Sequence, residues 1–187
     1  VTNNENGNIS RYSVTGDSLV TYMTRTTAAE GIYYDATADM VYQASRSDLQ
    51  LEAFADINTL IDGDAITSSF TGAADLESPR ELAVNGSSFV VADNGSNKFF
   101  VYENTGSGFT LMNTVVVPFP VWGITFKGDD LYAVVDTTGD LAVYYDFLSN
   151  ANSAILRPSK RVTIEGIVRT HGITYDGTDD VMVLTDI

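Results

Sequence analysis

Four chemically different side chains occupy one position of a repeated sequence pattern. They are Glu30, Arg80, Trp122 and His171, and each directly precedes a position that is usually glycine. A carboxylate can bind a cation, a guanidinium can form two hydrogen bonds to a carboxylate, and an indole offers an apolar face on which sugars and aromatic ligands stack. His171, the only His of the chain, can titrate near neutral pH as a base or ligate a metal. A purely structural position would more often repeat one residue type, so we treat these four as a candidate binding site.

Acidic residues add a candidate calcium site. Asp93, Asp136 and Asp186 end the second apolar run of their stretches, and with Glu30 they offer the hard oxygen ligands that Ca²⁺ prefers. The corresponding positions elsewhere hold Asn3, and Ser45 or Arg46. Structural alternatives remain open for all of these residues. Each Asp could bond backbone N–H groups of a turn, Trp122 could plug a channel, Glu30 and Arg80 could form an ion pair, and His171 could be a hydrogen-bonded structural residue.

The repeated pattern itself predicts the architecture. The stretches 29–45, 79–93, 121–136 and 170–186 each contain two apolar runs separated by an Asp, Asn or Gly turn. The equivalent positions Gly31, Glu81, Gly123 and Gly172 are spaced by 50, 42 and 49 residues. These spacings bracket the roughly 40 to 50 residues of a β-propeller blade.

Each repeat unit is predicted to hold four antiparallel strands. The alternation and the turn residues predict a hairpin first. Third strands are expected at 49–54, 98–103 and 141–146, and more polar fourth strands near 65–71, 111–117 and 161–165. A helical turn could lie within 51–64. The sequence therefore predicts an all-β fold, a β-propeller of four-stranded blades.

The chain is four blade equivalents long. We expect units at about 30–71, 79–117 and 121–165, and a fourth in which 170–187 joins 1–26, because residues 1–12 match 91–102 in pattern. Strands from both termini would then close one propeller domain and satisfy its open edges. A closed four-bladed ring and a segment of a larger propeller both remain open. The chain begins without Met and in the middle of the pattern, which suggests a processed or incomplete N-terminus.

The segment SPRELAVNGSSFVVADNGSNKFFVYE, residues 78–103, resembles the NHL repeat of the six-bladed propeller superfamily. That pattern runs Pro-x-Gly-Ile-Ala-Val-Asp, a turn, Val-Tyr-Val-Ala-Asp, then Asn-x-Arg-Ile-x-Val-Phe. The residues that follow it are Pro79, Leu82, Ala83, Val84, Val91, Ala92, Asp93, Asn97, Lys98, Val101 and Tyr102, while Glu81 replaces the usual Gly. The resemblance implies the fold. It leaves function open, since such families range from protein-binding scaffolds to metal-dependent lactonases and lyases.

A second resemblance supplies an enzymatic alternative. The segment AAEGIYYD, residues 28–35, is similar to the first blade of the gluconolactonase and senescence-marker family, in which a Glu before Gly binds a divalent metal. Glu30 matches that ligand. The remaining ligands of the family, mostly Asn, are replaced here by Arg80, Trp122 and His171. The alternative is a metal-dependent lactonase-like or lyase-like enzyme, with Glu30 and His171 as its catalytic candidates.

Composition limits the possible partners. The chain has 10 Lys and Arg against 25 Asp and Glu, a formal charge of −15, which repels nucleic acid and anionic membrane surfaces. No apolar run approaches the roughly 20 residues of a membrane span, and with no Cys there are no thiolate sites. We therefore expect a secreted, periplasmic or cell-surface bacterial protein, and we favour a noncatalytic binding or scaffolding module over an enzyme. It would bind a protein or carbohydrate through the loop-rich face of the channel.

Overall fold

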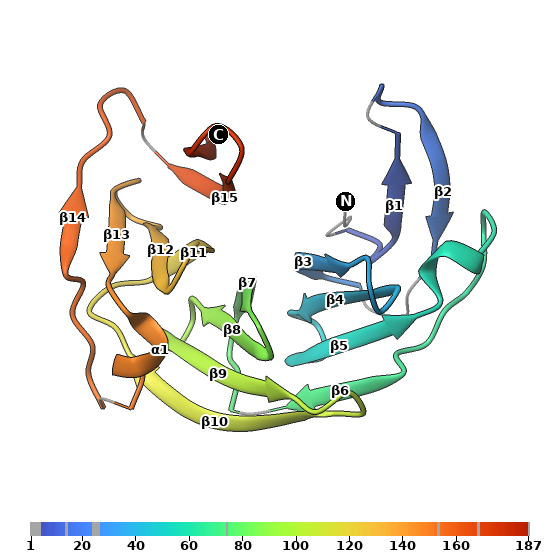
Figure 1. Cartoon of the computed structure of the whole chain (residues 1–187), viewed down its shortest axis with the longest axis horizontal. Helices are drawn as coiled ribbons and strands as arrows, with labels where there is room; N and C mark the ends of the chain where they lie inside the picture. Colours follow the sequence, from blue (N-terminus) through green and yellow to red (C-terminus); the bar gives the residue numbers. More distant parts are fainter. Residues whose placement is uncertain are drawn as a thin grey trace.

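The computed structural model describes residues 5–13, 15–23, 27–73, 75–152, 154–167 and 169–186, and for 18, 73 and 186 only the backbone. Within these residues the chain forms five antiparallel sheets arranged around a common centre (Figure 1), which makes it an all-β propeller. Three of the sheets have four strands each. The first consists, in spatial order, of β3 (Ala29–Asp35), β4 (Met40–Ser45), β5 (Gln50–Ala55) and β6 (Phe70–Ala73), and the second of β7 (Pro79–Asn85), β8 (Ser88–Asp93), β9 (Lys98–Asn104) and β10 (Phe109–Val116). The third consists of β11 (Val121–Lys127), β12 (Asp130–Val135), β13 (Leu141–Tyr144) and β14 (Lys160–Val162). The two-stranded sheets are β1 (Ile9–Tyr12) with β2 (Ser18–Tyr22), and β15 (Thr170–Asp176) with β16 (Val181–Asp186).

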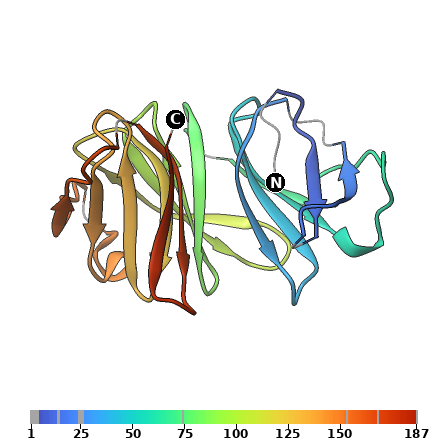
Figure 2. The same ribbon diagram turned by 90° about the horizontal axis from the view of Figure 1, so that it is seen from above.

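Alternation along each strand divides its side chains between two cores. On β8, Phe89 and Val91 pack in the cluster shared with the β3–β6 sheet, while Val90 and Ala92 pack in the cluster shared with the β11–β14 sheet. All four side chains are buried. A strand of a propeller blade therefore needs apolar residues on both faces. Figure 2 shows the sheets that enclose these cores standing side by side.

The inner strands β3, β7, β11 and β15 are successive neighbours around the centre. Glycine permits their close approach. A Cβ atom added to Gly31 would lie 2.6 Å from the Cα atom of Glu81, and one added to Gly123 would lie 2.5 Å from the carbonyl oxygen of His171. Such distances are far inside van der Waals contact. At Gly31 and Gly123 the glycine of the sequence pattern is therefore required by packing between inner strands.

The expected third and fourth strands occur as β5, β9, β13 and as β6, β10, β14, with shifts of a few residues at their ends. The ambiguous segment 51–64 contributes β5 and one turn of 3₁₀-helix, η1 (Ile57–Thr59). A short helix, α1 (Phe147–Asn150), was not expected; its Phe147 is fully buried. Among the described residues, no helix has the length and apolar composition needed to cross a bilayer.

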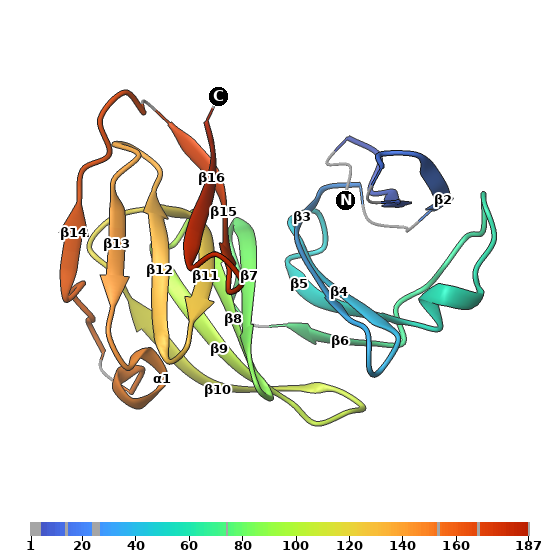
Figure 3. The same cartoon turned by 45° about the horizontal axis from the view of Figure 1, so that its top comes forward.

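The two half-blades lie apart. In Figure 3 the β15–β16 hairpin lies beside β11, and the β1–β2 hairpin lies across the molecule beside β3. Among the described residues they are separate two-stranded sheets with no ladder between them. The joint fourth blade stays a prediction. Closure of the ring stays a prediction, and Asn3 lies outside the described residues.

Candidate functional site

Each inner strand carries a β-bulge at the position of the four candidate residues. One extra residue lies on the inner strand between Ala29 and Ile32, between Pro79 and Glu81, between Val121 and Ile124, and between Thr170 and Ile173. A bulge bends the strand and redirects a side chain, and bulges are common beside functional sites. The four bulges therefore lie at the same level and bring the four side chains together at one mouth of the channel.

Glu30 is held by two arginines at this mouth. Its Oε1 atom lies 2.9 Å from Nη1 of Arg80 and 3.2 Å from Nε of Arg46. The side chains of Glu30 and Arg80 are 11% and 13% exposed, whereas that of Arg46 is 37% exposed. Burial lowers the pKa of Arg80, and the adjacent Glu30 carboxylate counteracts this effect. The Glu30–Arg80 pair is thus the less exposed part of the mouth, and Arg46 is more exposed and forms part of its rim.

Trp122 lies at the centre of a stack of cations and rings. Its ring is parallel to that of His171 within 1°, with 3.9 Å between the centroids. The guanidinium carbons of Arg80 and Arg169 lie 4.2 and 5.2 Å from the Trp122 ring centroid, which is within cation–π range. The indole is therefore engaged by three protein groups, from the neighbouring strands on both sides and from the segment before β15.

A second ion pair flanks the stack. Nε of Arg169, whose side chain is 48% exposed, lies 3.2 Å from Oδ1 of Asp136. Oδ2 of Asp136 accepts a hydrogen bond from the side-chain amide of Asn94 at 3.2 Å, and the same amide donates to the carbonyl oxygen of Val121. The loop after β8 is thereby tied to the residue that precedes Trp122. These contacts fix the position of the indole.

Glu81 lies below the rim, where the other blades carry glycine. It is half-buried and lines two pockets, one of about 270 Å³ at the mouth and one of about 320 Å³ farther along the inner strands. Burial raises the pKa of its carboxyl from 4.5 to about 7, although backbone N–H groups of Leu82 and Ile32 partly offset the effect; the charge of Glu30 raises it further. Glu81 can therefore exchange a proton near neutral pH.

His171 is the second titratable group of the mouth. Burial lowers its pKa below 6.5, and the positive charge of Arg169 acts in the same direction. Its Nε2 atom is buried and has no hydrogen-bond partner among the described residues. The imidazole is therefore neutral at physiological pH and stacks on Trp122 as an uncharged ring.

The structure brings Glu30, Arg80, Trp122 and His171 together around the mouth pocket, as the repeat pattern predicted. The candidate calcium ligands are arranged differently. Asp93 is buried and accepts hydrogen bonds from the backbone N–H groups of Glu77, Ser78 and Ser96. This is the structural role that the sequence left open for such aspartates.

The other carboxylates are also engaged. Asp136 and Glu30 are paired with arginines, and the side chain of Asp186 lies outside the described part of the molecule. In the part of the chain that the structure describes, no group of three or more His, Asp or Glu residues is arranged to hold a metal. The calcium site and the lactonase-like alternative therefore stay predictions.

Sequence reasoning missed Glu81, Arg169 and Asn94 as parts of the mouth. For Glu81 a signal was present, because a glutamate stands where the repeat has glycine. Arg169 comes two residues before the repeat position of β15, and Asn94 directly follows Asp93 in the turn after β8. Both residues belong to connecting segments, where the repeat pattern does not predict which way a side chain points.

Comparisons with known proteins indicate the fold and leave the activity open. No known protein family matches the sequence, and no curated protein matches it significantly. Among solved structures, the glutaminyl cyclase of Myxococcus xanthus is 14% identical over 99% of this chain and 79% of its own, with a TM-score of 0.68. The computationally designed Ika8 protein is 10% identical over 100% of this chain and 54% of its own, with a TM-score of 0.56. At these identities the likeness shows a shared propeller-like fold alone.

Proposed function

We propose that this chain is a noncatalytic binding propeller whose channel mouth recognises an acidic surface of a partner protein. The observation that carries the proposal is the Arg80–Trp122–His171 stack, with 4.2 Å from the guanidinium to the indole and 3.9 Å between the rings. Every member is held by packing or an ion pair, so a partner meets a preorganised surface. Preorganisation reduces the entropy lost on binding.

Charge supports an anionic partner. Arg46, Arg80 and Arg169 are three of the ten basic residues of a chain whose formal charge is −15. Against them stand the carboxylates of Glu30 and Asp136, so the mouth has an excess of one positive charge while the Glu81 carboxyl, whose pKa is about 7, is protonated, and loses this excess above that pH. The two rim arginines are 37% and 48% exposed, within reach of a ligand. Arginine at a rim favours carboxylates because it can donate two parallel hydrogen bonds.

A carbohydrate partner has weaker support. Sugar binding by stacking needs an accessible indole face, and the Trp122 ring is already contacted by His171, Arg80 and Arg169. A protein partner needs no such face, because its carboxylates can meet the rim arginines while the stack remains intact. We therefore favour a protein over a carbohydrate.

The proposal is tested with an acidic peptide. Binding of a Glu-rich peptide, followed by the emission of Trp122, should be saturable and should weaken as salt screens the charges. The double variant Arg46→Gln/Arg169→Gln should weaken it several-fold. Arg157→Gln/Lys160→Gln, which likewise removes two exposed positive charges, before and at the start of β14, is the matched surface control and should bind like the parent. Equal loss in the control, or no binding at low salt, would disprove the proposal.

An acid–base enzyme is the second candidate, and Glu81 is the observation that favours it. Its carboxyl, with a pKa of about 7, lines the same mouth pocket as His171. A protein of related fold is a glutaminyl cyclase. The assay is therefore turnover of a peptide with an N-terminal glutamine by the parent and by Glu81→Gln. Turnover that the variant loses would establish catalysis and displace the noncatalytic proposal.

We also infer that the chain belongs to NHL-type propellers and that it is exported from a bacterial cell. The support for the first is the match over residues 78–103, and for the second the acidic, Cys-free and turn-rich composition. A calcium ion is not part of the proposal, since the described carboxylates are engaged by protein donors.

A further inference from the structure

A pocket distinct from the channel lies between the β1–β2 hairpin and the β3–β6 sheet. It has a volume of about 340 Å³ and is lined mostly by apolar atoms. Its walls are Ile9, Ser10, Arg11, Tyr12, Tyr22, Ile32, Tyr34, Val41 and Ile57. A volume of this size falls at the small end of the roughly 300 to 1,000 Å³ typical of ligand pockets, most of which are apolar with a few well-placed polar groups.

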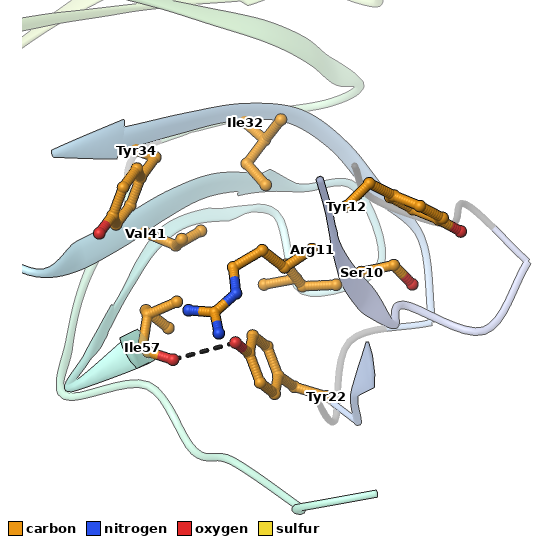
Figure 4. A pocket seen from close by; sticks show the side chains of 9 residues that line it. Ser10, Arg11, Tyr12, Tyr22, Ile32, Tyr34, Val41 and Ile57 are labelled. Carbon is orange, nitrogen blue, oxygen red and sulfur yellow. Dashed lines mark hydrogen bonds between the residues drawn. The ribbon is translucent and has the colours of Figure 1, made fainter. Parts of the chain in front are cut away.

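The polar group of this pocket is a guanidinium. Figure 4 shows Arg11 reaching across the pocket toward Ile57 and Tyr22. Its Nη1 atom donates to Oδ1 of Asn58 at 2.6 Å, whereas its Nε atom is buried and has no hydrogen-bond partner among the described residues. A buried N–H of a charged group without an acceptor is costly, and it marks a place for a ligand or water.

The guanidinium is held in place from behind. Nδ2 of Asn58 donates to Oδ1 of Asp39 at 2.7 Å and to the Tyr34 hydroxyl at 2.8 Å. The Tyr22 hydroxyl donates to the carbonyl oxygen of Ile57 at 2.9 Å. The arrangement engages Nη1 of Arg11 through Asn58 and leaves Nε, on a side chain that lines the pocket, without a hydrogen-bond partner among the described residues.

We propose that this pocket binds an aromatic monocarboxylate. The carboxylate would accept hydrogen bonds from Nε and the adjacent Nη of Arg11, which is the two-bond geometry that guanidinium groups favour. The ring would lie among the aliphatic side chains and the tyrosines of the wall. A water molecule occupies about 30 Å³ in the liquid and contributes one non-hydrogen atom, so by this measure the pocket of about 340 Å³ accommodates roughly ten such atoms. This is the size of a phenylpropionate.

The test uses 3-phenylpropionate and its neutral counterpart, 3-phenylpropanol, in calorimetric titrations of the full chain. The acid should bind at one saturable site and more tightly than the alcohol. Arg11→Met should weaken binding of the acid about 10- to 100-fold, the range for losing a charge-assisted hydrogen-bonded pair, and should change binding of the alcohol little. Arg46→Met, at the channel mouth, is the control and should bind the acid like the parent.

A second variant covers the case in which Arg11→Met does not fold. Arg11→Lys keeps the charge but presents no planar pair of donors, so it should weaken binding of the acid less than Arg11→Met would. Circular dichroism verifies the fold of each variant. The proposal is overturned if the acid does not bind, if a folded Arg11 variant binds it like the parent, or if Arg46→Met removes the binding.

Discussion

The desolvated carboxyl of the half-buried Glu81 should make the stability of this propeller depend on pH. Its pKa in the folded state is about 7, against an ordinary value of 4.5. A raised carboxyl pKa means that the protonated form favours folding, so this stabilisation is complete below pH 4.5 and is lost as pH rises through 7. The shift of 2.5 units, at 1.36 kcal/mol per unit, corresponds to about 3 kcal/mol. Glu81→Gln, which stays neutral, should therefore be about 3 kcal/mol more stable than the parent at pH 8 and similar to it at pH 4.5.

Urea denaturation at several pH values measures this difference. With a slope of about 2 kcal/mol per molar urea, the midpoint of the variant should exceed that of the parent by about 1.5 M at pH 8. Glu103→Gln removes the same formal charge from an exposed position on β9 and separates the effect of burial from that of net charge. If the parent and Glu81→Gln remain equally stable from pH 5 to pH 8, the argument about the buried carboxyl is refuted.

Three further predictions follow from packing and hydrogen bonding. Gly31→Ala, whose Cβ would lie 2.6 Å from backbone atoms of β7, should lower the free energy of unfolding by about 1 to 3 kcal/mol. The control Gly177→Ala, whose Cβ would lie 3.6 Å from its nearest neighbouring atom, should change it by less than about 0.5 kcal/mol. Equal effects of the two substitutions in urea denaturation would contradict the close approach of β3 and β7. Asp93→Ala leaves three backbone N–H groups without their acceptor and should cost about 3 kcal/mol in the same assay, and a loss below about 1 kcal/mol would deny it a structural role. Millimolar Ca²⁺ should leave the melting temperature unchanged within about 1 °C, and a rise of several degrees would reveal a site that the described carboxylates do not form.

The fold could be predicted from the sequence because its signal is repetitive. The stretches 79–93 and 121–136 contain runs of apolar residues on both sides of a turn, and a strand packed on both faces requires apolar side chains on each of its two faces. The number of residues between equivalent positions of successive stretches then predicts the length of a blade. The helix α1 escaped prediction because four residues are too few to establish a helical period, and its position depends on burying Phe147 in the core between blades.

The site could be predicted in position but not in chemistry. Equivalent positions in a repeat occupy equivalent places around an axis, so the meeting of Trp122 and His171 followed from the sequence. The sequence could not show that the indole is covered by ring and guanidinium groups, since those contacts depend on side-chain directions. Nor could it assign Asp93 to backbone N–H groups, because an Asp after a strand can serve a turn or a metal equally well.

The emission of Trp122 tests the central claim most directly, because the chain contains one Trp and one His and the structure stacks them at 3.9 Å. A protonated imidazole quenches a stacked indole by accepting an electron from its excited state. Emission should therefore fall with decreasing pH in a transition centred below 6.5, the ordinary pKa of histidine, since burial lowers the pKa of His171. His171→Gln should abolish this transition. An emission that does not change over this range in the parent, or a transition that persists in the variant, would show that the inner strands do not bring the two side chains together.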